Sequence, residues 1–97
     1  MEIESGEKDL EVRYRSYREA TRVWGKDLAN AYVRRIGFLV SAPNARTIRE
    51  ARGLRMHALR GERSGHFAID LIGRWRLIIT LVEDTVRVEE VSNHYGD

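Results

Sequence analysis

The sequence predicts a single α+β domain in which an N-terminal pair of helices packs on an antiparallel β-sheet. Apolar residues recur every three or four positions as far as Pro43 and alternate from Leu54 onward, so the chain changes once from helical to strand periodicity. Helices that precede a run of strands tend to cover one face of the sheet. The 97 residues can support one core, so residues 1–97 are expected to form one domain.

Two helices are expected before Pro43. The first begins at Lys8 and ends at Gly25, where glycine is a typical stop signal. The second begins at Lys26, and its apolar residues form a single stripe that consists of Leu28, Ala29, Tyr32, Val33, Ile36, Leu39 and Val40. The two helices are expected to pair antiparallel and to present apolar faces to the sheet.

Asn44 is placed to cap a short third helix that Gly53 ends. Beyond it, period-two alternation predicts strands over residues 54–59, 67–72, 75–82 and 86–91. The connections between them are short, which favours an antiparallel meander. Whether the N-terminal residues 2–4 add another strand stays open.

Composition excludes several classes of protein. The apolar fraction of 42% is that of a globular chain, and no apolar run approaches the roughly 18 residues of a membrane span. The absence of cysteine excludes disulfides and thiolate zinc sites. No secretory signal is visible at the N-terminus, so a cytoplasmic protein without membrane contact is expected.

The positive charge is concentrated in the middle of the chain. Residues 52–76 carry six arginines and two acidic residues, whereas residues 77–97 carry one arginine and five acidic residues. Of the 17 basic residues, 15 are arginine, which suits bidentate phosphate contacts. A GC-rich genome could explain the arginine bias but not its clustering. The pattern indicates a surface that meets phosphate.

Arg76 is the strongest single candidate for catalysis, because it is a charge inside the most apolar expected strand. Its side chain should point away from the face that Trp75 and Leu77 occupy. A guanidinium group there could stabilise the negative charge of a pentacoordinate phosphate. The alternative is a structural salt bridge to Asp70 or Glu89.

The remaining candidates lie in turns and at the C-terminus. Arg60 and Arg63 flank Gly61 in an expected hairpin turn, where functional side chains are common but solvated charges are equally so. Arg55 and Arg74 are weaker candidates, for positioning phosphate. The terminal pair His94-Tyr95 could move protons or stack on a base.

A metal site is not expected. His57 and His66 fall near the ends of adjacent expected strands, but no carboxylate is spaced to complete a ligand set with them. One packed and one edge histidine is the favoured interpretation. No glycine-rich phosphate loop is present either, so no cofactor is expected.

Residues 53–95 resemble the HigB branch of the RelE/ParE toxin superfamily. The resemblance rests on the run GLRMHALRGERSGHFAIDL at residues 53–71, on Arg74-Trp75-Arg76-Leu77 and on the tail Ser92-Asn93-His94-Tyr95. It implies a RelE-like fold and a type II toxin that a helix-turn-helix, HigA-like antitoxin neutralises. HigB-like toxins enter the ribosomal A site and cleave mRNA without a metal, by attack of the RNA 2′-hydroxyl on its own phosphate.

Transferred to this chain, the resemblance implies catalytic roles for Arg60, Arg76, His94 and Tyr95. It implies RNA-binding roles for Arg55, Arg63 and Arg74. At two positions the chain differs from the family pattern, which leaves open which residue carries out which step of the reaction. Arg60 stands where relatives often have lysine, and guanidinium is a poor proton donor. The tail reads His-Tyr where many relatives read Tyr-His.

Two other functions remain open at this stage. A ParE-like inhibitor of DNA gyrase would have the same fold without phosphoryl chemistry, because fold alone does not decide function. A non-catalytic RNA-binding module would use the same basic segment and would bind in a salt-sensitive way.

Overall fold

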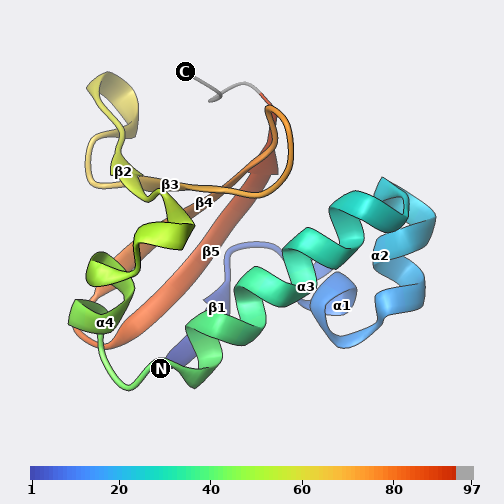
Figure 1. Ribbon diagram of the computed structural model, residues 1–97, viewed down its shortest axis with the longest axis horizontal. Helices are drawn as coiled ribbons and strands as arrows, with labels where there is room; N and C mark the ends of the chain where they lie inside the picture. The colour runs from blue at the N-terminus through green and yellow to red at the C-terminus, as the bar shows by residue number, and fades with distance from the viewer. Residues whose placement is uncertain (94–97) are drawn as a thin grey trace.

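The computed structural model, which describes residues 1–93, confirms the α+β architecture (Figure 1). Three consecutive helices, α1 (Lys8–Arg15), α2 (Tyr17–Trp24) and α3 (Lys26–Ser41), lie beside a five-stranded sheet, with a short helix α4 (Ala45–Glu50) at the end of α3. Of the helices described, none has the length and hydropathy needed to cross a membrane.

The expected first helix is in fact two helices, which is a correction. Ser16 adopts an extended backbone with φ −130° and ψ 102°, and its hydroxyl accepts a hydrogen bond from the Glu19 amide at 3.3 Å. This contact caps the first turn of α2 and ends α1. Gly25, with φ +81°, then separates α2 from α3 as expected, since only glycine adopts that backbone without strain.

The other helix boundaries agree with the sequence prediction. Helix α3 begins at Lys26, ends before Pro43, and buries most of the expected stripe, although Val40 is exposed. Helix α4 is capped by Asn44, whose side-chain oxygen accepts a hydrogen bond from the Thr47 amide at 3.0 Å. A 3-10 turn, η1 (Arg52–Leu54), follows it.

The sheet order is β1-β5-β4-β3-β2. The expected meander is confirmed for β2 (His57–Ala58), β3 (Phe67–Asp70), β4 (Arg76–Val82) and β5 (Thr85–Ser92), which pair antiparallel in turn. Residues 2–4 do form a strand: β1 (Glu2–Ser5) pairs parallel with β5. A second 3-10 turn, η2 (Gly61–Arg63), lies between β2 and β3.

The expected strand over residues 54–59 is largely wrong. Only His57 and Ala58 pair with β3, because Leu54 turns into the core, where it is 2% exposed, and Arg55 takes a left-handed backbone with φ +51°. A left-handed residue cannot continue a strand. Arg55 therefore forms a corner in the backbone, two residues before the edge strand β2 begins.

The hydrophobic core lies between the helices and one face of the sheet. Helices α1, α3 and α4 contribute buried residues to it, and the strands contribute Ile69, Leu77, Ile79, Val86 and Val88. The residues that alternate with these strand positions lie on the opposite face, which we call the distal face. It carries Ala68, Asp70, Arg76, Ile78 and Glu90.

Candidate functional site

Two neighbouring rows of cross-strand pairs form the centre of the distal face. The first row crosses β2 to β5 and consists of His57, Ala68, Ile78 and Glu90. The second row crosses β3 to β5 and consists of Asp70, Arg76 and Ser92. Rows two residues apart along a strand are separated by about 7 Å. Small and apolar side chains thus form a floor, with charged groups around it.

A β-bulge places Glu90 on this face. The register between β4 and β5 shifts between Ile78 and Ile79, so that Ile79 pairs with Val88 whereas Ile78 pairs with Glu90. Glu89 is the extra residue in the bulge. An unbroken ladder would have placed Glu90 on the core face, since residues alternate between the faces of a strand.

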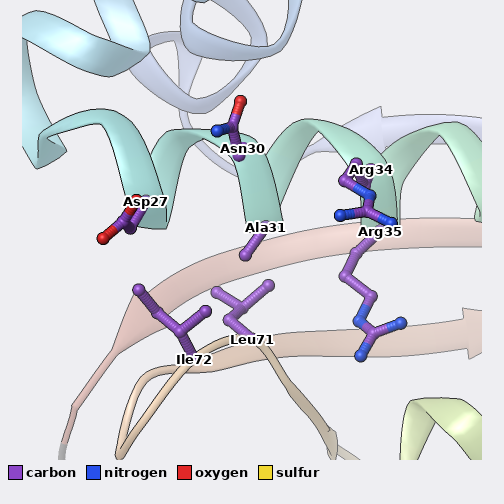
Figure 2. A pocket seen from close by; sticks show the side chains of 7 residues that line it. All are labelled: Asp27, Asn30, Ala31, Arg34, Arg35, Leu71 and Ile72. Atoms are coloured by element: carbon purple, nitrogen blue, oxygen red, sulfur yellow. The ribbon is translucent and has the colours of Figure 1, made fainter.

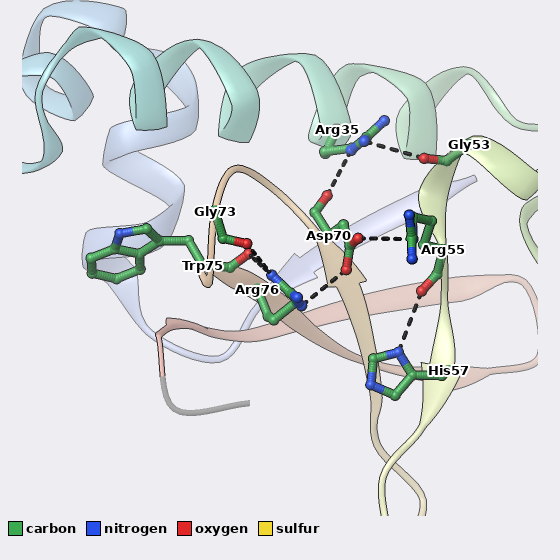
Figure 3. Close-up of polar contacts among 8 residues, drawn as sticks. All are labelled: Arg35, Gly53, Arg55, His57, Asp70, Gly73, Trp75 and Arg76. Carbon is green, nitrogen blue, oxygen red and sulfur yellow. Dashed lines mark hydrogen bonds and ion pairs between the residues drawn. The ribbon is translucent and has the colours of Figure 1, made fainter. Parts of the chain in front are cut away.

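Asp70 joins two of the candidate arginines. Its carboxylate contacts the Arg76 guanidinium, with Nε 2.9 Å from Oδ1, and the Arg55 guanidinium, with Nε 3.2 Å from Oδ2 (Figure 3). Arg76 also donates hydrogen bonds to the carbonyls of Gly73 at 2.8 Å and Trp75 at 2.9 Å. The structural salt bridge considered for Arg76 is therefore present, with Asp70 rather than Glu89.

The two arginines differ in their access to solvent. The side chain of Arg76 is 11% exposed and held on three sides, whereas that of Arg55 is 78% exposed. The contact of Arg55 with Asp70 is through Nε, and most of the Arg55 side chain remains open to solvent. Arg76 is suited to stabilise charge at a fixed point, and Arg55 can reach an incoming phosphate.

Arg63 lies on the same face, at the end of η2. It forms an ion pair with Glu90, which brings the β2–β3 connection down onto β5. Arg60 begins that turn, and its backbone carbonyl accepts a hydrogen bond from the Arg63 amide at 3.3 Å. Its side chain is exposed and makes no hydrogen bond or ion pair within residues 1–93. Arg60 is thus not brought into the cluster around Asp70.

The other predicted site residues are less defined. Arg74 is exposed in the connection between β3 and β4, two residues before β4 begins at Arg76. His94 and Tyr95 lie outside the described residues, so their predicted roles stay predictions. The strand β5 ends at Ser92, which pairs with Arg76 of β4.

His57 is the residue that the sequence interpretation undervalued. It is exposed on the distal face, opposite Ala68, and its Nδ1 lies 3.3 Å from the Arg55 carbonyl oxygen. Donation from Nδ1–H to that carbonyl leaves Nε2 as a proton acceptor. The alternation of residues around His57 did not predict this contact, because the turn at Arg55 determines where the His57 side chain lies.

Outside the distal face, a groove of about 530 Å³ lies between α3 and the β3–β4 connection. Figure 2 shows its lining of Asp27, Asn30, Ala31, Arg34, Arg35, Leu71 and Ile72, which includes none of the predicted site residues. Within residues 1–93, no group of three or more potential ligand side chains is placed to hold a metal ion.

Comparisons with known proteins identify the fold. No protein family model matches the chain, and a sequence search of curated proteins finds no match. Solved structures do match. YafQ from E. coli strain BL21(DE3) has a TM-score of 0.67 at 16% identity, over 96% of this chain and 92% of that chain.

Two further structures agree. YafQ in the E. coli DinJ–YafQ toxin–antitoxin complex has a TM-score of 0.64 at 20% identity, over 96% of this chain and 91% of that chain. The YoeB/ParE toxin from Agrobacterium tumefaciens has a TM-score of 0.61 at 13% identity, over 98% of this chain and 100% of that one. The chain therefore has the RelE-like α+β fold of these toxins.

Proposed function

We propose that the chain is the toxin of a type II toxin–antitoxin system and acts as a ribosome-dependent mRNA endoribonuclease. The fold that it shares with YafQ and YoeB toxins supports the toxin assignment. The observation that carries the endonuclease assignment is the cluster on the distal face, where Arg55 and Arg76 share Asp70 beside the exposed imidazole of His57.

The reaction follows from these groups. The RNA 2′-hydroxyl attacks the adjacent phosphorus, the bond to the 5′-oxygen breaks, and a 2′,3′-cyclic phosphate and a 5′-hydroxyl result. Arg76, which is held by Asp70 and two carbonyls, stabilises the charge that develops on the phosphoryl oxygens. His57 Nε2 accepts the 2′-hydroxyl proton, and the tail pair His94 and Tyr95 supplies the proton for the leaving oxygen.

The shape of the site supports dependence on the ribosome. The floor residues Ala68 and Ile78 are buried, and Arg55 at the margin of the site is mostly exposed. Such a surface fixes little of a flexible RNA by itself. A partner that holds the message in an attacking conformation would supply the orientation that accelerates the reaction.

The finer assignments belong to the same proposal. The run at residues 53–71 favours the HigB branch, a HigA-like helix-turn-helix antitoxin as partner, and action in the cytoplasm. The DinJ–YafQ toxin–antitoxin complex and the YoeB–YefM complex support a protein partner for a chain of this fold.

The test is to map mRNA 5′ ends after brief induction in a bacterial host, with translated and untranslated versions of one message. We expect cuts at codon-periodic positions in the translated message alone. Arg76→Gln should abolish the cuts. Arg46→Gln should not, because Arg46 is exposed on α4 and pairs only with Glu50 of the same helix.

Other results would contradict the proposal in different ways. Growth arrest without cuts, with DNA replication stopping before translation, would indicate a gyrase inhibitor. Salt-sensitive RNA binding without any cleaved product would indicate a non-catalytic RNA-binding module.

A further inference from the structure

One arginine of the helical layer is joined to the site. Arg35 extends from α3 toward the sheet, where its Nε donates a hydrogen bond to the Asp70 carbonyl at 2.9 Å (Figures 2 and 3). One of its terminal amino groups donates to the Gly53 carbonyl at 3.3 Å. The side chain is partly buried, and α3 anchors it through the core residues Tyr32, Ile36 and Leu39.

The two carbonyl acceptors belong to the two segments that carry the site. Asp70 ends β3 and supplies the carboxylate that Arg76 contacts. Gly53 lies in η1, two residues before the left-handed corner at Arg55. The strand that otherwise joins these segments, β2, is two residues long. Arg35 therefore ties the Asp70 backbone to the Gly53 backbone, beside the ion pair that joins the Asp70 carboxylate to Arg55.

We propose that Arg35 is a positioning residue for the reaction on the distal face. It acts through Asp70 and the Arg55 corner, and in this way it sets the orientation of the Arg76 and Arg55 guanidinium groups. It touches no substrate itself. This inference rests on the proposed endoribonuclease function for its catalytic consequence, but its structural part can be tested without any cleavage assay.

The geometry requires arginine at this position. A planar guanidinium group can donate to two separate carbonyls at once, whereas a lysine ammonium is a single point donor on a flexible stem.

Arg34, the neighbour of Arg35 on the same helix, provides a matched control. Arg34 carries the same charge on the same helix and lines the same groove, but its side chain is exposed and makes no hydrogen bond or ion pair within residues 1–93.

The first experiment follows the arginine Nε–H groups by NMR in the full-length protein. Arg35→Gln should shift the Nε–H signals of Arg55 and Arg76 and speed their exchange with water, and Asp70→Asn should affect the same two signals. Arg34→Gln should leave them unchanged. If Arg35→Gln leaves both signals in place, the proposal is overturned.

The second experiment measures cleavage of a defined mRNA on programmed ribosomes under single-turnover conditions. A displacement near 1 Å can cost about a hundredfold in rate, so Arg35→Gln should lower the rate at saturation by about ten- to a hundredfold. Arg35→Lys should recover only part of it. Both glutamine variants remove one positive charge, so their half-saturating concentrations should rise equally.

The outcomes are distinguishable. Equal loss of rate in Arg34→Gln and Arg35→Gln would overturn the positioning role in favour of a general charge effect. If Arg35→Gln alters the NMR signals but leaves the cleavage rate unchanged, the proposed effect of Arg35 on the reaction is overturned. If the wild-type protein cleaves nothing, the proposed function fails, and the NMR signals alone decide whether Arg35 orients the cluster. A thermal unfolding scan of each variant shows whether a lost rate reflects lost folded protein.

Discussion

Replacing Asp70 by asparagine separates the stability of the site from its affinity for phosphate. The change keeps the size of the side chain and one oxygen acceptor but removes the charge that Arg55 and Arg76 share. We expect the folded state to become less stable while RNA binding becomes tighter. Few substitutions move these two quantities in opposite directions, so the outcome is diagnostic.

The loss of stability comes mainly from the contact with Arg76. The Asp70 side chain is 25% exposed and the Arg76 side chain 11%, and removing the ion-pair partner of a largely buried group costs about 1–3 kcal/mol. The exposed Arg55 adds only about 0.2–1 kcal/mol. For an m-value of about 2 kcal/mol/M, a loss of about 2 kcal/mol lowers the urea midpoint by about 1 M.

The gain in affinity comes from removing a like charge. A phosphate bound to Arg55 and Arg76 would lie roughly 7 Å from the Asp70 carboxylate, where Coulomb repulsion in a strongly hydrated site amounts to about 0.6–1 kcal/mol. Its removal should tighten binding about three- to fivefold. Fluorescence anisotropy with an oligonucleotide that lacks the attacking 2′-hydroxyl measures this without cleavage.

The control is Glu50→Gln, which removes an equal charge from the exposed end of α4. It should change neither the urea midpoint nor the affinity appreciably, because exposed pairs contribute little. Weaker RNA binding in Asp70→Asn, with an unchanged midpoint, would refute the reasoning. Phosphate would then not bind at the arginines around Asp70.

Three further predictions test other parts of the fold. Glu90→Gln should weaken the hold on Arg63 and remove a negative charge from the distal face, and it should therefore increase the salt dependence of RNA binding. Anisotropy between low and moderate salt measures this, and an unchanged slope would exclude the Arg63–Glu90 pair from the phosphate surface. Asn44→Ala removes the α4 cap and should cost about 1 kcal/mol in urea unfolding, whereas Asn44→Ser should cost little. Burial raises the pKa of Tyr32 above its ordinary value of about 10. The contribution of the neutral phenol to the free energy of unfolding should therefore be complete below pH ~10 and should fall as the pH rises further. Tyr32→Phe should remove that fall in a series of unfolding curves at different pH values.

Local periodicity was enough to predict most of the secondary structure, but it missed the break at Ser16 and made the strand over residues 54–59 too long. The apolar spacing of a helix continues through Ser16, so residues 8–24 read as one helix. The missed signal is Ser16 followed three residues later by Glu19, which is the pattern of a capping box. Strand β5 illustrates the opposite case, because its valines switch phase between Val88 and Val91, and the bulge at Glu89 is the physical consequence.

The site was less predictable than the fold, because it depends on backbone corners and on register. The sequence was enough to propose Arg55 and Arg76 as candidate site residues. Their meeting at Asp70, however, requires the left-handed turn at Arg55, and arginine carries no signal for that backbone. His57 lies on the edge strand β2, in agreement with the expectation of one edge histidine, but its contact with the Arg55 carbonyl depends on the same turn.

The distal face shows how a strand as apolar as β4 can carry a charge. Arg76 stands at its first residue, where the carbonyls of the preceding turn and the Asp70 carboxylate replace the water that the guanidinium group loses. Charges arranged in this way stabilise the fold only as a set, because removing one partner leaves the other desolvated. An incoming phosphate can therefore take over part of the Asp70 contact without a net loss of hydrogen bonds. The Asp70→Asn variant therefore measures how much the Asp70 carboxylate stabilises the arginines and how much it opposes a bound phosphate.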